Sequence, residues 1–281
     1  MKIKITSDST CDLSLELAER YGVKITPLYI NMDGKPLRDR VDISPDDIFS
    51  HIEKTGELCF TSACNIGEYL EVFTTLRQEY DAVIHISISS DFSSSYQNAV
   101  LAAQELDNVY VVDSRNLSSG HGYLVIHASE MAAAGMDASA IVDALKSEVD
   151  KVDVSFILDQ LEYLRKGGRC SSVAALGANL LKLKPCIEVV DGKMHVGKKY
   201  RGAFDKCVDQ YIRERLAEAD KMDLRRVFLT YSSVSAETEA LALRVIRECI
   251  GEDAEIIVSQ AGGTVSCHCG PGTLGIILVR K

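Results

Sequence analysis

Three segments of the sequence are rich in serine and threonine hydroxyls, and their placement could bind an anion. They are residues 7–10 (SDST), 89–95 (SSDFSSS) and 113–120 (DSRNLSSG). Each follows a predicted strand and precedes a predicted helix. In a parallel sheet such loops meet at the carboxyl edge of the strands, where ligands usually bind. Hydroxyl groups and free backbone N–H groups at helix N-termini both donate hydrogen bonds to anions.

A fourth hydroxyl pair, Thr61 and Ser62, lies just before a predicted helix over residues 67–79 and could reach the same edge. For any single loop, helix capping is the commoner use of a serine. Four such segments within one domain favour an anion-binding edge over capping alone. The hydroxyls by themselves leave the identity of the anion open.

Cations and a histidine in the second half of the chain are further candidates for binding an anion. Arg165, Lys166 and Arg169 flank a double glycine. Cations suit the C-terminal end of a helix because of its dipole, and the alternative is that Arg169 points at an anion. His268 heads the turn-forming segment 268–272 (HCGPG), where it either donates to an anion or packs within the turn. The residue types leave these alternatives open.

Motifs for three other chemistries are incomplete. Residues 192–198 (GKMHVGK) have the glycine and lysine spacing of a P-loop, but Lys199 stands where serine or threonine is needed, and the segment spans a predicted hairpin. The segment 267–269 (CHC) lacks a second Cys/His pair at zinc-finger spacing. The sequence has no Gly-x-Ser-x-Gly elbow for a serine hydrolase, so a nucleophile at Ser93 has no support, and His85 is interpreted as a core histidine. We therefore expect no metal and no cofactor.

The elements that must position these groups alternate along the first half of the chain. Strands are predicted over residues 2–6, 23–30, 82–87 and 109–112. Helices are predicted over residues 13–21, 67–79, 96–106 and 122–134, with another that starts at 44–47. This alternation predicts a mainly parallel sheet with helices on both faces, an α/β domain.

The second half of the chain predicts a smaller α+β domain. Asp191-Gly192 between strands over 185–190 and 193–197 is a strong hairpin signal. Further strands are predicted over residues 154–158, 227–231, 254–259 and 275–279, and helices over 161–166, 202–221 and 236–250. We expect residues 1–152 to form the α/β domain with the serine-rich loops and residues 153–281 to form the α+β domain.

Composition limits the classes of partner. Of the 281 residues, 46% are hydrophobic and 26% charged, and the formal net charge is −10. That charge disfavours nucleic-acid binding, which needs a basic surface. The sequence has no apolar run of the roughly 18 residues that a membrane-spanning helix needs, so we expect no stable membrane insertion. The N-terminus does not resemble a signal peptide, and the nine scattered cysteines are expected to be reduced thiols. These observations predict a cytoplasmic protein.

Taken together, these segments resemble the DegV family of bacterial fatty-acid-binding proteins along nearly the whole chain. The matching pieces lie within residues 8–13, 61–68, 89–97, 112–120, 161–169 and 268–272. The most specific of them is LEYLRKGGR at 161–169. The resemblance implies a carrier and not an enzyme. It implies that one long-chain fatty acid lies in a tunnel closed by the domain 153–281, and that a separate ATP-dependent fatty acid kinase subunit converts the presented carboxylate to an acyl phosphate.

The resemblance also implies contacts for individual residues. Thr61 and Ser93 would hydrogen-bond the carboxylate, with Arg169 and His268 near the head group. The full expected set is Thr61, Ser62, Ser93, Ser94, Ser95, Ser118, Arg169 and His268. Ser93-Ser94-Ser95 replaces the usual Ser-Gly-Thr, so contacts could shift to Ser94 or Ser95. Ser266-Cys267 precede His268 in place of Gly-Thr, which leaves a redox or regulatory role of Cys267 and Cys269 open.

Apolar stretches could line the tunnel, and two other functions compete with the carrier. The stretches lie at residues 99–106, 131–134 and 173–183, and ordinary core packing is the alternative for each. A stand-alone phosphotransferase or serine hydrolase could use the same loops. A regulatory module that binds another lipid or a small anion is the third hypothesis.

Overall fold

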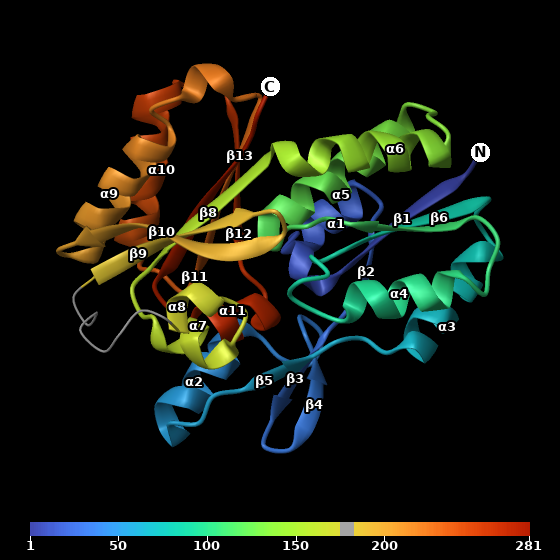
Figure 1. Cartoon of the computed structure of the whole chain (residues 1–281), viewed down its shortest axis with the longest axis horizontal. Coiled ribbons are helices and arrows are strands. Elements are labelled where there is room, and N and C mark those ends of the chain that lie inside the picture. The colour runs from blue at the N-terminus through green and yellow to red at the C-terminus, as the bar shows by residue number, and fades with distance from the viewer. Residues whose placement is uncertain (175–182) are drawn as a thin grey trace. The chain divides into compact units, whose positions relative to one another are not determined.

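Figure 1 shows a computed structural model of the chain, which describes residues 1–174 and 183–281. The chain divides into two compact units. Unit 1 comprises Met1–Ser44, Cys59–Asp150 and Gly262–Thr264, and unit 2 comprises Pro45–Leu58, Lys151–Ala261 and Val265–Lys281. Between the long segments of the two units, the division falls after Asp150, two residues before the expected boundary at residue 152. The two short segments, Pro45–Leu58 and Gly262–Thr264, belong to a different unit from the residues that flank them in the sequence. The prediction of a single domain boundary did not include these two exchanges.

The centre of unit 1 is a four-stranded parallel sheet, as the sequence predicts. Its strands in spatial order are β2 (Lys24–Thr26), β1 (Ile3–Asp8), β6 (Ala82–Ser87) and β7 (Val109–Asp113). Every residue of β6 is buried, which is expected of a central parallel strand covered on both faces.

Helices cover both faces of this sheet. The helices of unit 1 are α1 (Leu15–Arg20), α3 (Ile66–Arg77), α4 (Ser95–Ala103), α5 (Ser118–Ala133) and α6 (Ala138–Glu148), with a 3₁₀ turn over Ser9–Cys11. In Figure 1, α3 and α4 lie on one side of the sheet and α5 and α6 on the other. The predicted α/β class is thereby confirmed. Helix α5 starts four residues earlier than predicted, and α6 was not predicted although its buried residues have the spacing of an amphipathic helix.

A small antiparallel sheet in unit 1 was also not predicted. Its strands in spatial order are β4 (Lys35–Arg38), β3 (Tyr29–Met32) and β5 (Phe60–Ser62). The single strand expected over residues 23–30 is therefore wrong: it is two strands separated at Pro27, which has no N–H to continue a ladder. Asp33 and Gly34 form the β3–β4 turn, and both have positive φ, as a tight hairpin requires.

Unit 2 contains a six-stranded mixed sheet. Its strands in spatial order are β10 (Lys193–Arg201), β9 (Leu183–Val190), β8 (Val152–Leu158), β13 (Thr273–Val279), β11 (Arg226–Ser232) and β12 (Glu255–Gln260). Among the strand pairs described for this sheet, only β11–β12 is parallel. Asp191 and Gly192 both have positive φ, so the predicted β9–β10 hairpin is confirmed.

The helices of unit 2 pack on this sheet and on each other. They are α2 (Pro45–Thr55), α7 (Glu162–Gly167), α8 (Ser171–Ala174), α9 (Phe204–Arg215), α10 (Ala236–Ile250) and α11 (Gly263–Cys269), with 3₁₀ turns over Val149–Lys151 and Ala219–Lys221. Tyr211 and Val245 anchor the core that α9 and α10 share with β11 and β13. The predicted helix 202–221 is too long at its C-terminal end. It stops at buried Leu216, where the chain turns so that Met222 can pair with Arg280.

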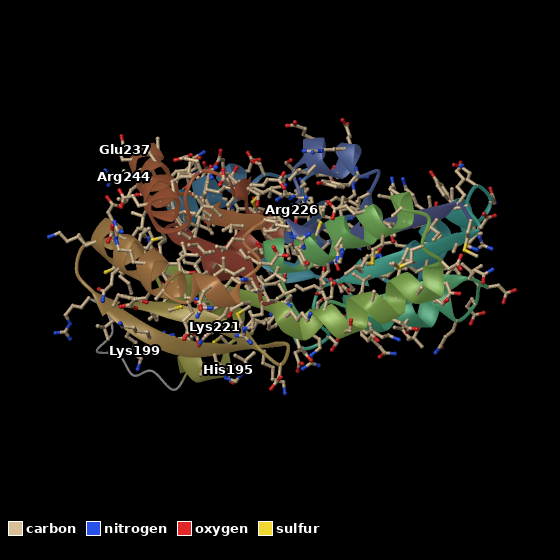
Figure 2. All side chains as sticks on the ribbon, turned by 90° about the horizontal axis from the view of Figure 1, so that it is seen from above. His195, Lys199, Lys221, Arg226, Glu237 and Arg244 are labelled. Carbon is tan, nitrogen blue, oxygen red and sulfur yellow. The ribbon has the colours of Figure 1, made fainter. Side chains whose placement is uncertain are left out.

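Strand β10 forms an edge of this sheet and presents exposed cations. Lys193, His195, Lys199 and Arg201 are all exposed along it, and Figure 2 shows the His195 and Lys199 side chains projecting away from the ribbon. The register also shifts between Val196 and Lys199. Charged side chains and irregularities of this kind hinder edge-to-edge pairing of sheets, which accounts for the cations structurally.

Candidate functional site

The hydroxyls of Ser93 and Ser95 form a pair at the N-terminus of α4. Their oxygens are 2.9 Å apart, and the backbone N–H of Ser95 donates to Ser93 Oγ at 3.1 Å. Ser95 is buried, Ser93 is half-buried and Ser94 is exposed. Ser94 is the N-cap residue but makes no capping hydrogen bond through its side chain. The first turn of α4 therefore offers two adjacent hydroxyls beside helix N-terminal amides, a donor set that suits an anion.

Thr61 and Ser62 lie on strand β5 and not in a loop. They pair with Ile30 and Tyr29 of β3. Consecutive strand residues point to opposite faces, so a single head group can meet only one of them. Ser62 is exposed and its hydroxyl accepts a hydrogen bond from Asn31 Nδ2 at 3.2 Å, whereas Thr61 is half-buried. Thr61 is therefore the better candidate of the two.

A network of hydrogen bonds fixes the segment between β5 and α3. Asn65 and Glu68 form a reciprocal capping box at the start of α3. Tyr29 of β3 donates its phenol hydrogen to Glu68, and Asn98 of α4 donates to the carbonyl of Cys64 at 2.8 Å. These bonds hold β5, the start of α3 and the first turns of α4 together, so the Thr61 strand and the Ser93–Ser95 pair have fixed positions within unit 1.

The carboxylate of Asp8 organises the buried end of β1. It accepts hydrogen bonds from the backbone of Ile88 at 2.9 Å, from Ser87 Oγ at 3.1 Å and from Thr10. Ser9 donates to Asp39 at 3.0 Å. All of these side chains are buried, so the hydroxyl-rich segment 7–10 stabilises the sheet edge and presents no donor at the surface.

His121, which the sequence did not single out, meets Ser7 beside Asp8. His121 Nε2 is 2.8 Å from Ser7 Oγ, and its Nδ1 is 3.9 Å from the nearer Asp8 oxygen, too far for a hydrogen bond. All three side chains are fully buried. Burial lowers the pKa of His121 and lowers that of His85 to about 4. These are the residue types of a catalytic triad, but the hydrogen bond from the carboxylate that would orient the imidazole is missing, so they give no support to a serine hydrolase.

Ser118 makes an internal contact that uses its hydroxyl hydrogen. Its Oγ donates to Asp12 Oδ2 at 2.5 Å, and Asp12 also accepts from the backbone of Gly262 at 2.7 Å and from Arg40 at 3.3 Å. Burial raises the pKa of Asp12 to about 6 despite the nearby guanidinium. A serine has one hydroxyl hydrogen, so in this arrangement Ser118 has none left for a fatty-acid carboxylate. The structure assigns it to the support of Asp12.

Arg169 and His268 come together within unit 2. Arg169 lies between α7 and α8, is exposed, and donates to the carbonyl of Gly167 at 2.8 Å. His268 packs so closely on α7 that a Cβ atom on Gly167 would overlap its Nδ1. Burial and the positive charge of Arg169 lower the pKa of His268 to about 4. The pair is thus an exposed cation beside an imidazole that is neutral at neutral pH.

The expectation that His268 heads a turn is wrong, because His268 belongs to helix α11. The first two residues of this helix, Gly263 and Thr264, donate their backbone N–H groups to the carboxylate of Asp39 at 2.8 and 3.1 Å. A carboxylate at a helix N-terminus stabilises the helix. Asp39 is remote in sequence, so local patterns could not reveal it.

Two of the expected tunnel-lining stretches serve other roles in part. Ala99 and Ala102 are fully buried in the core that α4 shares with Tyr69 and Phe73 of α3, and only the opposite face of α4 remains available. Met131 is buried while Ala133 and Ala134 are exposed at the end of α5. Residues 175–182 of the third stretch lie outside the described residues.

The described parts of the chain contain no candidate metal site and no candidate membrane-spanning helix. Within residues 1–174 and 183–281, His, Cys, Asp and Glu side chains do not gather in groups of three or more that could hold a metal ion. Cys267 and Cys269 are buried thiols. Over the same residues, we find no helix with the length and apolarity needed to cross a bilayer.

Known proteins match this chain along its length. The family model described as "Uncharacterised protein, DegV family" matches residues 2–281. A DegV domain-containing protein of Caldanaerobacter subterraneus is 31% identical over 284 residues, which cover 100% of this chain and 99% of that protein.

Solved structures share the fold. A DegV family protein from Thermus thermophilus, described by its fatty acid binding, superposes with a TM-score of 0.92 at 30% identity and covers 100% of both chains. A protein from Eubacterium ventriosum, described as binding stearic acid, has a TM-score of 0.87 at 27% identity, with 99% of this chain and 98% of that chain covered.

Proposed function

Since the chain belongs to the DegV family, we propose that it binds one long-chain fatty acid and holds its carboxylate with the hydroxyls of Thr61, Ser93 and Ser95. The observation that carries this proposal is the Ser93–Ser95 pair at the N-terminus of α4. It supplies hydrogen-bond donors to an anion without supplying a nucleophile with a base. The fatty acid binding described for the Thermus structure and the stearic acid named for the Eubacterium structure support the choice of ligand.

The energetics of a buried acyl chain favour tight binding. Each buried methylene contributes about 0.8 kcal/mol, so about fifteen carbons contribute about 12 kcal/mol before the cost of association. An unpaired buried carboxylate would offset much of this gain. Hydroxyl and amide donors reduce that cost through charge-assisted hydrogen bonds. The proposal assigns this role to the start of α4, and it assigns closure of the acyl-chain tunnel to the domain 153–281.

We further propose that a separate fatty acid kinase subunit phosphorylates the presented carboxylate to an acyl phosphate for phospholipid synthesis. Arg169 is exposed and adjacent to a neutral His268, which suits contact with a phosphoryl group or with the partner. The donor in this step is ATP, so the step belongs in the cytoplasm. The protein itself is then a carrier with no cofactor and only the fatty acid as ligand.

The content of bound lipid tests the carrier directly. Organic extraction of the purified protein, followed by mass spectrometry, is expected to release one fatty acid per chain. Protein stripped of lipid is expected to bind oleate or palmitate, and Ser147→Ala, which removes an exposed hydroxyl of α6, is expected to bind equally well. Recovery of no fatty acid, together with no binding of added oleate, would reject the carrier.

The requirement for a partner separates the carrier from a stand-alone phosphotransferase. The oleate-loaded chain is expected to show no ATP binding by calorimetry, and with ATP and hydroxylamine alone to give no acyl hydroxamate. Addition of a fatty acid kinase catalytic subunit is expected to produce it. Hydroxamate formed by the isolated chain would instead establish the stand-alone enzyme.

A further inference from the structure

The side chain of Asn98 joins the two elements that carry the proposed head-group donors. Asn98 lies on α4, three residues after Ser95, and its Nδ2 donates to the carbonyl of Cys64 at 2.8 Å. Cys64 follows strand β5, three residues after Thr61. A carbonyl oxygen only accepts hydrogen bonds, so the amide nitrogen of Asn98 and not its oxygen faces Cys64. Each end of this one bond is therefore three residues from a proposed donor to the carboxylate.

The Asn98 end of the bond is fixed by its helix. The backbone N–H of Asn98 donates to the carbonyl of Ser94 at 2.9 Å, so Asn98 follows directly on the turn that carries the serine hydroxyls. The next residue, Ala99, is fully buried in the core that α4 shares with α3. Helix residues three or four apart lie on the same face. The Asn98 amide therefore keeps a constant position relative to the serine hydroxyls.

The Cys64 end of the bond belongs to the short connection between β5 and α3. The reciprocal bonds of Asn65 and Glu68 fix this connection to α3. The bond from Asn98 fixes the same connection to α4. Loss of the Asn98 bond is therefore expected to let the end of β5, and Thr61 with it, move relative to the serine pair.

We propose that Asn98 is a positioning residue whose bond sets the spacing between the hydroxyls of Thr61 and Ser93, and that this spacing makes the site selective for a carboxylate over an uncharged head group. The inference rests on the proposed fatty-acid function and goes beyond it, because it assigns selectivity to a residue that does not touch the ligand. A carboxylate accepts charge-assisted bonds through two oxygens, so it gains most from two donors held at a fixed spacing. An alcohol or a methyl ester is uncharged and gains less from the second donor.

The variant Asn98→Ala tests this selectivity. The helix is expected to persist, because alanine is the better helix former and water can replace the amide at a partly buried carbonyl. The dissociation constant for oleate is expected to rise about three- to tenfold, as for loss of one hydrogen bond, while those for oleyl alcohol and methyl oleate stay within about twofold. Gln104→Ala, which removes an exposed amide at the other end of α4, is the matched control and should change none of the three.

A double-mutant cycle distinguishes positioning from a general loss of stability. In the natural protein, Ser93→Ala is expected to weaken oleate binding about three- to tenfold. In the Asn98→Ala background it is expected to weaken oleate binding by less than about twofold, because misplaced donors bind the carboxylate one at a time and the remaining donor is sufficient. A merely structural role of Asn98 predicts that the effects of the two substitutions add.

Hydrogen exchange of the ligand-free protein measures the fixation of the strand itself. The backbone amides of residues 61–65 are expected to exchange faster in Asn98→Ala than in the natural protein, with those of α4 unchanged. Additive substitutions, equal weakening of all three lipids, unchanged oleate affinity or unchanged exchange of residues 61–65 would each overturn the assignment to Asn98. Absence of oleate binding by the natural protein would instead overturn the fatty-acid function, so the two failures are distinguishable.

Discussion

The imidazole of His268 packs directly on the backbone of Gly167, so closely that a Cβ atom on residue 167 would overlap His268 Nδ1. The double glycine after the α7 cations thus has a specific use. Gly168 ends α7 with a positive φ, while Gly167 leaves room for the histidine.

We expect Gly167→Ala to destabilise the protein by about 1–3 kcal/mol, because added volume in a packed contact must displace its neighbour. Urea unfolding monitored by circular dichroism measures the change. In a His268→Ala background the same glycine substitution is expected to cost much less, since the overlapping ring is gone. If Gly167→Ala lowered the free energy of unfolding equally in both backgrounds, the contact with His268 would not be the reason that residue 167 must be glycine.

Removal of the Arg169 charge is expected to raise the pKa of His268. Burial and the Arg169 charge both lower that pKa, to about 4. In Arg169→Gln the charge effect disappears while burial remains, so the pKa should rise and stay below the ordinary value of about 6.5. NMR titration of the imidazole measures it. Arg165→Gln, which removes a neighbouring exposed cation, is the control and should leave the titration unchanged.

Asp12 is expected to make the unfolding free energy depend on pH. Its pKa is about 6 in the folded state and 3.8 in the reference state, so the folded protein binds the proton more tightly. The stabilisation is complete below pH 3.8 and is lost as the pH rises through 6. Relative to Asp12→Asn, the natural protein should lose about 3 kcal/mol between pH 3 and 7, at 1.36 kcal/mol per pKa unit. Parallel stability curves for the two proteins would contradict this assignment.

Substitutions at Ser93 and Ser118 are expected to have different effects, the first on oleate affinity and the second on the free energy of unfolding. Ser93→Ala should weaken oleate about three- to tenfold, because one hydrogen bond to the carboxylate is lost. Ser118→Ala should leave oleate affinity unchanged and lower the unfolding free energy by about 1–3 kcal/mol, because it removes a donor from buried Asp12. Fluorescent fatty-acid displacement and chemical unfolding measure the two effects. A large loss of oleate affinity in a folded Ser118→Ala protein would instead show that Ser118 contributes to binding of the carboxylate head group.

Residue patterns were sufficient for the elements whose signals are local. The buried apolar run Ala82–Ser87, the amphipathic Ala236–Ile250 and the Asp191-Gly192 turn all carry their structure within a few neighbouring residues. The order of these elements also indicates the α/β class, because parallel strands need crossovers that are usually helices. The Ser93–Ser95 segment could be found in the same way, since a strand, hydroxyls and a helix follow one another there.

Those local patterns could not predict contacts between residues that are far apart in the sequence. Asp39 caps a helix more than 200 residues away, and Ser118 gives its hydrogen to Asp12. A hydroxyl or carboxylate has the same composition whether it is satisfied internally or available to a ligand. The tertiary structure determines which acceptor each donor is hydrogen-bonded to. Those hydrogen bonds determine which of the many serines can bind an anion.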